Sequence, residues 1–422
     1  MGPGNMLPSP TQIDKTYTLH VLEKLISIPT VNPPGKNYDE IAQYLEETLT
    51  TLGIKAKTVM VPEEVVAQYY PWAQNYPRYI VIGRVGEGRP VLHFNGHYDV
   101  VPAGHGWTKD PFKPSKEDDK VYGRGASDMK GGIAAIIAML RGLQEEGWEP
   151  SKGSIEVSFT PDEEVGGKTG VKYMLDSGLS FPDYAIVAEP SGLDRIWIGS
   201  RGILWMNIKI YGKQAHGSAP WLGLNAFEGM VKIAHHLIEE YKNIISRRKT
   251  DLPMDDERGA YPSVTIGGEV DGGAKTNIVP GFYSFSIDRR IIPGEDVDFV
   301  EKELREFVNS KASLLERQGY RVEVEVTEKA PATWISERSP FVEIISQIIE
   351  KELRQTPLRT VCIGGLDTRY FQERGINAVT LGPGILEIAH MPDEYIELES
   401  VVKAAQIYSV LAKNVDRLQR GL

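Results

Sequence analysis

The sequence alternates short apolar runs that end in polar residues with stretches of helical periodicity, and this alternation limits the possible folds more than any other feature. The strand-like runs are RYIVIGRV (78–85), PVLHFNGHYDV (90–100), SIEVSFTPDEE (154–164) and YAIVAEPS (184–191). Apolar residues recur at helical spacing within 13–53, 131–147, 340–354 and 399–417. Strands that alternate with helices form a mainly parallel sheet covered on both faces, so we expect an α/β fold.

Residues 200–329 follow a different pattern. The expected elements, in order, are a strand at 203–212, a helix at about 224–248, strands at 263–270 and 282–291, a helix at about 295–317 and a strand at 321–328. This β-α-β-β-α-β order is that of a ferredoxin-like module, whose four-stranded sheet has one face in water. Because 422 residues exceed the usual size of a single core, we expect 200–329 to be a small domain inserted into a larger one formed by 1–199 and 330–422.

Charge and composition exclude several classes of function. The formal net charge of −11 argues against a basic surface for nucleic acid, and the longest apolar runs are too short to span a bilayer. The first twelve residues, MGPGNMLPSPTQ, lack the basic and apolar regions of a signal peptide. The single cysteine, Cys362, makes an intramolecular disulfide impossible, which fits a reducing cytoplasm. We therefore expect a cytoplasmic protein that binds neither nucleic acid nor membrane.

Five polar motifs follow or adjoin the expected elements. They are HYD (97–99), GRGASDMKGG (123–132), PDEEVGG (161–167), AEPS (188–191) and the histidine of EIAHMPDE (387–394). Open α/β sheets bind their ligands at the carboxyl ends of the strands, where most of these motifs fall. Each motif alone has an ordinary explanation, such as a helix cap for Asp128 or a solvated acidic loop for Glu163 and Glu164.

Together the motifs supply two histidines and three carboxylates, which is enough for two zinc ions that share a carboxylate and a water. Along an extended chain Asp99 points the same way as His97, so it can hold one imidazole nitrogen while the other binds metal. A metal hydrolase needs one carboxylate as ligand and one as base, and the adjacent Glu163 and Glu164 can divide those roles.

The order of these motifs strongly resembles the M20 metallopeptidase family, over about residues 18 to 415. The resemblance implies a catalytic domain, an inserted lid or dimerisation domain, and two divalent metal ions, zinc first with cobalt or manganese as alternatives. It implies that His97 and Glu189 bind one metal, that Glu164 and His390 bind the other, and that Asp128 bridges both. It also implies a cis peptide bond between Asp128 and Met129.

The resemblance assigns further roles. Asp99 orients His97, and Glu163 is the general base that takes a proton from water and returns it to the leaving amine. His216, in AHGSAP, resembles the lid histidine that reaches a neighbouring subunit's active site and stabilises the oxyanion, which implies a homodimer. Judged from the residues alone, His216 is equally well an ordinary loop residue.

Four residues resemble the family's substrate contacts. Asn277 and Arg290 match the TN-x-x-P and D-x-R motifs, and Arg201 matches an arginine-glycine step at the start of the lid. Arg369, in GGLDTRYF, resembles the arginine that grips the substrate's α-carboxylate, a task that suits the planar guanidinium fork. For Arg289 we expect a surface salt bridge instead.

The resemblance implies hydrolysis of the amide bond of an N-acetyl or N-succinyl amino acid. Glu189 favours this deacylase activity, since dipeptidase-like members tend to have aspartate there, and DTRY is closer to the aminoacylase and desuccinylase pattern. The alternative is a carboxypeptidase or dipeptidase acting on short peptides. A non-catalytic metal-binding homologue is a third interpretation, but such a protein would usually lack the base or a ligand, and here every position is filled.

Overall fold

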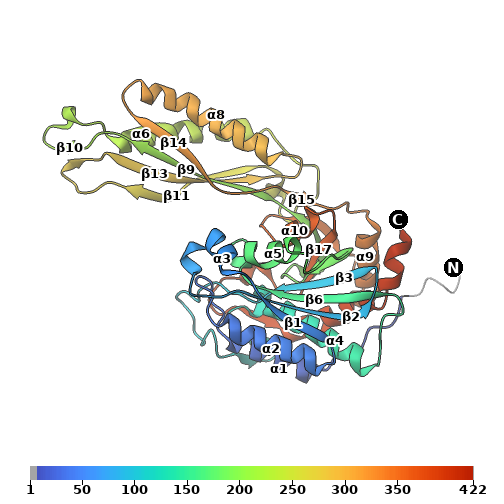
Figure 1. The fold of residues 1–422 in the computed structure, drawn as a ribbon. Helices are drawn as coiled ribbons and strands as arrows, with labels where there is room; N and C mark the ends of the chain where they lie inside the picture. The colour runs from blue at the N-terminus through green and yellow to red at the C-terminus, as the bar shows by residue number, and fades with distance from the viewer. Residues whose placement is uncertain (1–6, 422) are drawn as a thin grey trace. The chain divides into compact units, whose positions relative to one another are not determined.

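The computed structural model describes residues 7–421 and divides the chain into two compact units. Unit 1 comprises the residues up to Ile198, Ile335–Thr360 and the residues from Leu366 onward. Unit 2 comprises Gly199–Trp334 and Val361–Gly365. Each unit has a sheet and a hydrophobic core of its own (Figure 1).

Most strands of a nine-stranded sheet lie in unit 1 and form its frame. Its order is β1-β2-β6-β3-β7-β17-β8-β15, with β16 paired to β8. The strands are β1 (Lys55–Met60), β2 (Tyr79–Glu87), β3 (Val91–His97), β6 (Gly153–Thr160), β7 (Tyr184–Val187), β8 (Gly192–Ser200), β15 (Thr333–Trp334), β16 (Leu358–Cys362) and β17 (Asn377–Gly382). Strands β6, β3, β7 and β17 pair in parallel, whereas β1, β2, β8 and β15 are added antiparallel.

The predicted α/β fold with a mainly parallel central sheet is therefore confirmed. Every residue of β3, β6 and β7 is buried, because helices cover both faces of the parallel centre. One face carries α1 (Lys15–Ser27), α2 (Tyr38–Thr51) and α4 (Gly131–Glu145), and the other carries α3 (Glu63–Tyr69), α5 (Tyr173–Asp176) and α10 (Thr368–Gln372) (Figure 1). Helices α9 (Pro340–Leu353) and α11 (Leu398–Ala412) complete the unit.

Some elements were absent from the sequence-based expectation. The missed strands and helices include β1, β8, α3 and a three-stranded sheet of β4 (Ser115–Glu117), β5 (Lys120–Tyr122) and β18 (Tyr395–Glu397). The last helix also ends earlier than expected, at Ala412, and a short 3-10 helix follows it (Val415–Gly421). These elements are short or lack a clear period, so their apolar residues give little local signal.

Unit 2 contains a four-stranded antiparallel sheet in the order β11-β13-β9-β14. Its elements are β9 (Gly202–Tyr211), α6 (Ala226–His236), α7 (Lys242–Ile245), β11 (Ser263–Gly272), β13 (Phe282–Ile291), α8 (Val297–Glu316) and β14 (Arg321–Ala330). The β-α-β-β-α-β order expected from the sequence is present, and one face of the sheet packs on the helices through a single apolar cluster. A two-stranded ribbon of β10 (Ala215–His216) and β12 (Ile278–Val279) extends one end.

The carboxyl ends of the four parallel strands meet at one edge of the unit 1 sheet. They are His97, Thr160, Val187 and Gly382. Three of the five polar motifs, HYD, PDEEVGG and AEPS, lie at or just after these ends. Within residues 7–421, no helix has both the length and the apolar character needed to cross a membrane.

Candidate metal centre

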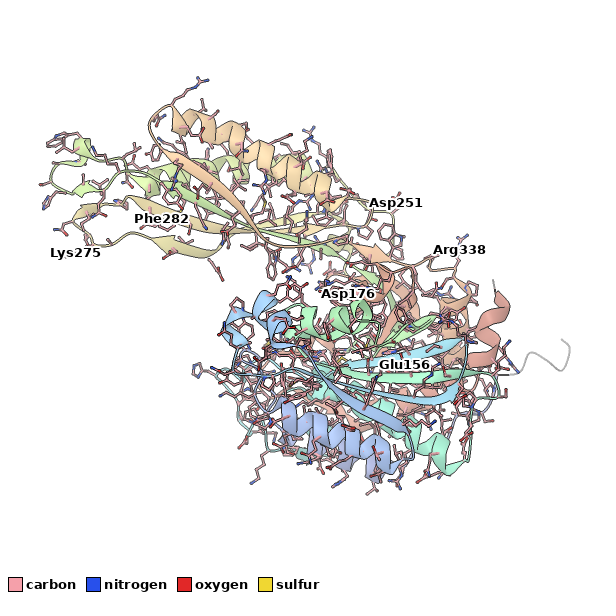
Figure 2. All side chains as sticks on the ribbon, viewed as in Figure 1. Glu156, Asp176, Asp251, Lys275, Phe282 and Arg338 are labelled. Carbon is pink, nitrogen blue, oxygen red and sulfur yellow. The ribbon has the colours of Figure 1, made fainter. Side chains whose placement is uncertain are left out.

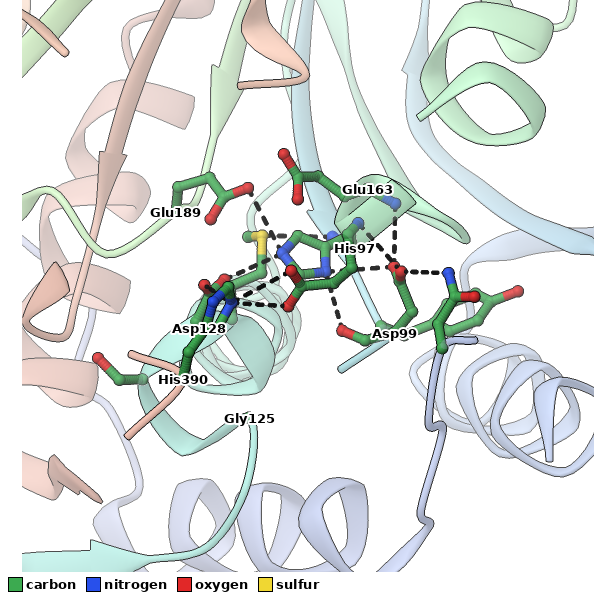
Figure 3. Close-up of polar contacts among 12 residues, drawn as sticks. His97, Asp99, Gly125, Asp128, Glu163, Glu189 and His390 are labelled. Atoms are coloured by element: carbon green, nitrogen blue, oxygen red, sulfur yellow. Dashed lines mark hydrogen bonds and ion pairs between the residues drawn. The ribbon is translucent and has the colours of Figure 1, made fainter. Parts of the chain in front are cut away.

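The polar motifs of unit 1 come together at this edge of the sheet (Figure 3). His97 is the last residue of β3, and Glu189 follows β7 by two residues. Glu163 and Glu164 begin a single 3-10 turn after β6. Asp128 lies in the turn before α4, and the predicted cis peptide bond between Asp128 and Met129 is present.

The start of α4 lies against the strand end that carries Glu189. A Cβ added to Gly132 would lie 2.1 Å from the carbonyl oxygen of Ala188, so only glycine fits this contact. The second glycine of DMKGG therefore brings the Asp128 turn next to the Ala188–Glu189 step.

His97 is 1% exposed and its two ring nitrogens face different groups. Its Nε2 lies 3.1 Å from Oδ1 of Asp128 and 3.4 Å from Oε1 of Glu189. Its Nδ1 lies 3.3 Å from Oδ1 of Asp99 and 3.0 Å from the backbone oxygen of the same residue. One imidazole nitrogen is thus held by Asp99, while the other points at a pair of carboxylates.

His390 contacts the other oxygen of Asp128 and a further carboxylate, that of Glu164. Its Nε2 lies 3.2 Å from Oδ2 of Asp128 and 3.1 Å from Oε2 of Glu164. The two oxygens of Asp128 therefore face different histidines, His97 and His390. This is the arrangement that a bridging carboxylate requires.

The residues present fit a metal ion. Two groups of side chains could each hold an ion: His97 with Glu163 and Glu189, and His97 with Asp128 and Glu164. Within each group the donor atoms lie within 4.8 Å of one another. Oε1 of Glu189 is buried and makes no well-formed hydrogen bond among residues 7–421, and its contact with Nε2 of His97 is long, at 3.4 Å. A buried carboxylate oxygen without such a bond is costly unless a cation meets it, and imidazole with carboxylate is a typical zinc donor set.

The acidic groups of the site resist ionisation. Burial raises the pKa of Glu163 well above its usual range, and the charge of Glu189 raises it further. Burial also raises the pKa of Glu164 to about 7, and the charge of Asp128 adds to this effect. Burial likewise raises the pKa of Glu189 to about 8, although His97 opposes the rise.

The histidines and Asp128 favour their charged forms. Hydrogen bonds to Asp128 and Glu164 raise the pKa of His390 to about 10. Burial opposes the charging of His97, but the charge of Glu189 and a hydrogen bond to Asp128 still raise its pKa well above the usual value. Burial opposes the ionisation of Asp128 as well, yet His390 and His97 hold its pKa far below normal. The metal-free site therefore binds extra protons at neutral pH, which a divalent cation would displace.

A set of buried residues that the sequence-based reasoning missed supports the turn of Glu163 and Glu164. Asp162, just before the two glutamates, forms a fully buried ion pair with Nε of Arg78 at 2.7 Å. It also accepts hydrogen bonds from Nδ2 of Asn32 at 2.9 Å and from the hydroxyl of Tyr38 at 3.0 Å. Asp162 belongs to the PDEE motif, but its partners are far away in sequence and carry no local signal.

Arg369, expected to grip the substrate, lies on α10 and is 7% exposed. Its Nη2 donates to the carbonyl oxygen of Gly166 at 2.8 Å and to the hydroxyl of Tyr370 at 3.0 Å. It thus contacts the end of the turn that carries Glu163. The neighbouring Asp367 was missed: it is buried, burial raises its pKa to about 7, and its Oδ2 has no donor among the residues that the structure describes.

The other expected site residues lie in unit 2, in two pairs. His216 and Asn277 are adjacent, because the backbone nitrogen of Gly217 donates to the carbonyl oxygen of Asn277 at 2.8 Å. Arg201 and Arg290 form the second pair: burial lowers the pKa of Arg201 to about 10, and the charge of Arg290 lowers it further. Nε of Arg201 is buried without an acceptor among residues 7–421.

These two pairs lie at opposite ends of the unit 2 sheet. Arg201 precedes β9, whereas His216 and Asn277 lie beyond its other end, where Figure 2 shows Lys275 and Phe282. The ten residues of β9 span roughly 30 Å at about 3.4 Å per residue. One small molecule cannot reach both pairs of the same unit.

Arg289 forms the expected salt bridge, but the expectation that it lies at the surface was wrong. Arg289 is 0% exposed, and its Nη2 pairs with Oε1 of Glu295 at 2.5 Å. On β13 it follows Phe285 and Ile287 at a spacing of two, so its side chain lies on the buried face of the sheet. Neighbouring Arg290 lies on the other face and pairs with Asp288 at 2.9 Å.

The chain is similar to known proteins in sequence and in fold. The model of Peptidase family M20/M25/M40 matches residues 93–414. A probable succinyl-diaminopimelate desuccinylase of Staphylococcus aureus (strain MRSA252) is 25% identical, over 94% of this chain and 97% of its own. A metallo-carboxypeptidase of the M20 family from Sulfolobus solfataricus has a TM-score of 0.75 at 22% identity, over 94% of this chain and 99% of its own. A dinuclear metal-binding M20 peptidase from Bacillus subtilis has a TM-score of 0.68 at 19% identity, over 96% and 98%. The two solved structures establish a shared fold.

Proposed function

This chain belongs to peptidase family M20/M25/M40 and is thus a metal-dependent hydrolase, and on that premise we propose that it cleaves the amide bond of an N-acyl amino acid with two metal ions. The observation that carries the proposal is the position of Asp128. Its Oδ1 lies 3.1 Å from Nε2 of His97 and its Oδ2 lies 3.2 Å from Nε2 of His390. A single carboxylate between two histidines suits a pair of metal ions that share one ligand.

Each proposed metal has its own ligands besides Asp128. His97 and Glu189 would hold one ion, since Glu189 Oε1 lies 3.4 Å from His97 Nε2. Glu164 and His390 would hold the other, since they lie 3.1 Å apart. The histidine and carboxylate donors suit zinc first, and cobalt or manganese as alternatives.

When bound, the two ions would lower the pKa of a water molecule and polarise the scissile carbonyl. In this proposal Glu163 takes the proton of the attacking water and returns it to the leaving amine. Burial raises the pKa of Glu163, which suits a group that must accept a proton and release it again. Asp99 holds the imidazole of His97 through Nδ1, so its Nε2 stays directed at the carboxylates.

The proposed substrate carries a free α-carboxylate. Arg201 supports this, because its Nε is buried without an acceptor among the described residues, and burial together with the nearby charge of Arg290 disfavours its cation. An incoming carboxylate would relieve both effects. Arg369 remains a proposed carboxylate contact, although its Nη2 is already bound to the carbonyl of Gly166. That contact gives it a second role in holding the turn of Glu163.

We propose a homodimer formed through unit 2. The separation of roughly 30 Å between the Arg201 end and the His216 end of the sheet supports a dimer. A small substrate can contact Arg201 and His216 together only if the two residues come from different chains. Helix α6 and its continuation also expose Phe227, Val231 and Ile238, each about half exposed on one face. In the assembled enzyme His216 would stabilise the oxyanion in the partner's site. The single cysteine, Cys362, cannot form an intramolecular disulfide, which suits the proposed cytoplasmic location.

A carboxypeptidase or dipeptidase is the second candidate. The same ligands and base can cleave any linear amide, and the Sulfolobus solfataricus structure with a TM-score of 0.75 is named a metallo-carboxypeptidase. The test is an activity screen of the metal-supplemented protein on N-acetyl amino acids, N-succinyl amino acids and dipeptides. Cleavage of acylated amino acids at the highest kcat/KM supports the deacylase, and preference for dipeptides overturns it.

A further inference from the structure

A carboxylate outside the proposed ligand set holds the turn that carries Asp128. Glu394 is 1% exposed, and its Oε1 accepts hydrogen bonds from the backbone nitrogens of Ser127 at 2.9 Å and Asp128 at 3.0 Å. Its Oε2 accepts from the backbone nitrogen of Gly125 at 3.1 Å and from Nη1 of Arg124 at 2.6 Å. Four donors thus meet on one buried carboxylate, and three of them are backbone groups of the turn.

Arg124 connects this turn to the loop that carries His390. The guanidinium is 1% exposed and donates through Nη2 to the carbonyl oxygens of His390 at 3.2 Å and Ala103 at 3.1 Å. Its Nη1 also reaches the carbonyl oxygen of Met391 at 3.3 Å. The planar fork therefore contacts Glu394 and two consecutive backbone carbonyl oxygens, those of His390 and Met391.

The position of His390 depends on its backbone. Its side chain is 49% exposed, so little besides Asp128 and Glu164 constrains the imidazole. Its φ of 64° is a left-handed conformation that residues other than glycine adopt only when their surroundings hold them there. The hydrogen bond from Arg124 to the His390 carbonyl is one such restraint.

The Arg124–Glu394 pair is more than a generic buried ion pair. Two buried charges lose their hydration, so apolar residues of similar size often serve stability as well or better. Nearby Lys130 is also buried, but its Nζ donates to the carbonyl oxygens of Leu25 and Ile28, both at 2.8 Å. Arg124 is therefore the cation that neutralises Glu394, and the contacts of the pair converge on two proposed metal ligands, Asp128 and His390.

We propose that Arg124 and Glu394 are positioning residues that hold Asp128 and His390 at the separation required by a metal ion before the ion binds. The inference rests on the proposed function, because it takes both residues to be metal ligands. Groups that orient metal ligands typically contribute about 10- to 100-fold to metal affinity. The pair joins segments about 270 positions apart, so metal binding does not have to bring them together.

The test is the metal affinity of Glu394→Gln. Glutamine replaces one acceptor oxygen by an amide that cannot accept from the turn, while the volume stays the same. Metal-stripped protein is titrated with Co²⁺ and with Zn²⁺ against a chromophoric chelator. We expect affinity about 10- to 100-fold weaker than wild type and an altered visible absorption spectrum of the Co²⁺ form.

The matched control is Glu295→Gln in unit 2. Glu295 pairs with the buried Arg289 at 2.5 Å and accepts from the backbone nitrogen of Ile292 at 3.1 Å. The substitution therefore weakens the same kinds of contact, a buried ion pair and a hydrogen bond from the backbone. We expect this variant to lose thermal stability as Glu394→Gln does and to keep wild-type metal affinity and the wild-type Co²⁺ spectrum. A purely structural role for Glu394 would make the two variants alike in metal binding.

A second variant keeps the test decisive if Glu394→Gln does not fold. Arg124→Lys retains the positive charge beside Glu394 but replaces the fork that reaches His390 and Ala103, so its metal affinity should also fall. Suppose that the wild type binds two ions and that either folded variant keeps the wild-type metal affinity and Co²⁺ spectrum. This result would overturn the inference and leave the proposed function standing. A wild-type protein that takes up no metal overturns the proposed function and this inference with it.

Discussion

The carboxylate of Asp99 accepts a hydrogen bond from the backbone nitrogen of Glu163 at 3.1 Å, so the residue that contacts His97 also fixes the proposed base. Its other oxygen accepts from the backbone nitrogen of Glu164 at 3.2 Å and from Nδ2 of Asn32 at 2.9 Å. One buried side chain thus links the end of β3 to the turn after β6. Metal-ligand orientation and base orientation are therefore coupled.

Asp99→Asn should impair both metal binding and turnover. Asparagine offers one acceptor oxygen, so its amide would face a backbone N–H of the Glu163–Glu164 turn. We expect metal affinity to fall about 10- to 100-fold, with a lower kcat even at saturating metal. Asp183→Asn is the control, because Asp183 accepts from the backbone nitrogen of Val91 at 2.7 Å at the other end of β3. Full turnover of Asp99→Asn at saturating metal would contradict the coupling.

Glu163→Gln should keep both metal ions and lose most of the activity. The amide cannot accept the proton of the attacking water, and acid–base catalysis of this kind contributes on the order of 100-fold or more. The measurement pairs kcat with the metal content of the purified variant. Because donor atoms of Glu163, His97 and Glu189 lie within 4.8 Å of one another, the loss of one ion would instead make Glu163 a ligand.

His216 should act on the active site of a partner chain. Loss of one oxyanion donor typically lowers turnover about 100- to 1000-fold, so His216→Ala should be nearly inactive. Mixing it with Glu163→Gln should restore part of the activity, because a hybrid dimer contains one site with both residues intact. Gln214→Ala serves as the control, because Gln214 is an exposed residue just before the same ribbon. No rescue after demonstrated subunit exchange would place the whole site in one chain.

The sequence predicted the parts of the site that local pattern determines. His97 ends a buried parallel strand, and Glu163, Glu164 and Glu189 follow two others. The topology of such a sheet brings strand ends to one edge. The residues that hold the site in place could not be predicted from local pattern. Asn32 reaches Asp162 across 130 positions, and a lone asparagine before two prolines has no pattern that predicts such a partner.

The prediction of a surface position for Arg289 was wrong for a different reason, because the sequence pattern does indicate where this residue lies. The strand 282–291 alternates, and Phe285, Ile287 and Ile291 are the apolar members of one face. Arg289 has the same parity, so the period of two places it among them. The surface position was expected because charged residues usually lie at the surface, whereas the alternation of the strand predicts a buried position. Its buried partner, Glu295, comes from the turn that follows the strand.

The metal-free protein should become less stable as pH rises from about 5.5 to 8.5. Burial raises the pKa of Glu164 to about 7 and that of Glu189 to about 8, and hydrogen bonds to Asp128 and Glu164 raise the pKa of His390 to about 10. In the unfolded chain these groups release their protons at lower pH. The folded state therefore binds more protons over this interval, and its stability falls as they are lost.

Urea unfolding of the metal-stripped protein at several pH values measures this effect. Added Zn²⁺ should remove much of the pH dependence, because it replaces the protons, and its stabilisation should be larger at pH 8 than at pH 6. Glu164→Gln combined with Glu189→Gln should flatten the profile of the metal-free protein. A metal-free form that gains stability between pH 5.5 and 8.5 would contradict the electrostatic description of the site.

The substrate's α-carboxylate should be recognised by Arg201. Wild-type enzyme should cleave an N-acyl amino acid much better than its carboxamide. Arg201→Met should raise KM for the acid roughly 10- to 100-fold, since a charge-assisted hydrogen bond contributes about 1.5–3 kcal/mol and each 1.4 kcal/mol is tenfold. The same variant should affect the carboxamide little, because that substrate never had the contact. Arg258→Met is the control, as the Arg258 side chain is 91% exposed in unit 2. Equal kcat/KM for the acid and the carboxamide would refute the carboxylate anchor and indicate a peptidase that acts on internal or amino-terminal bonds.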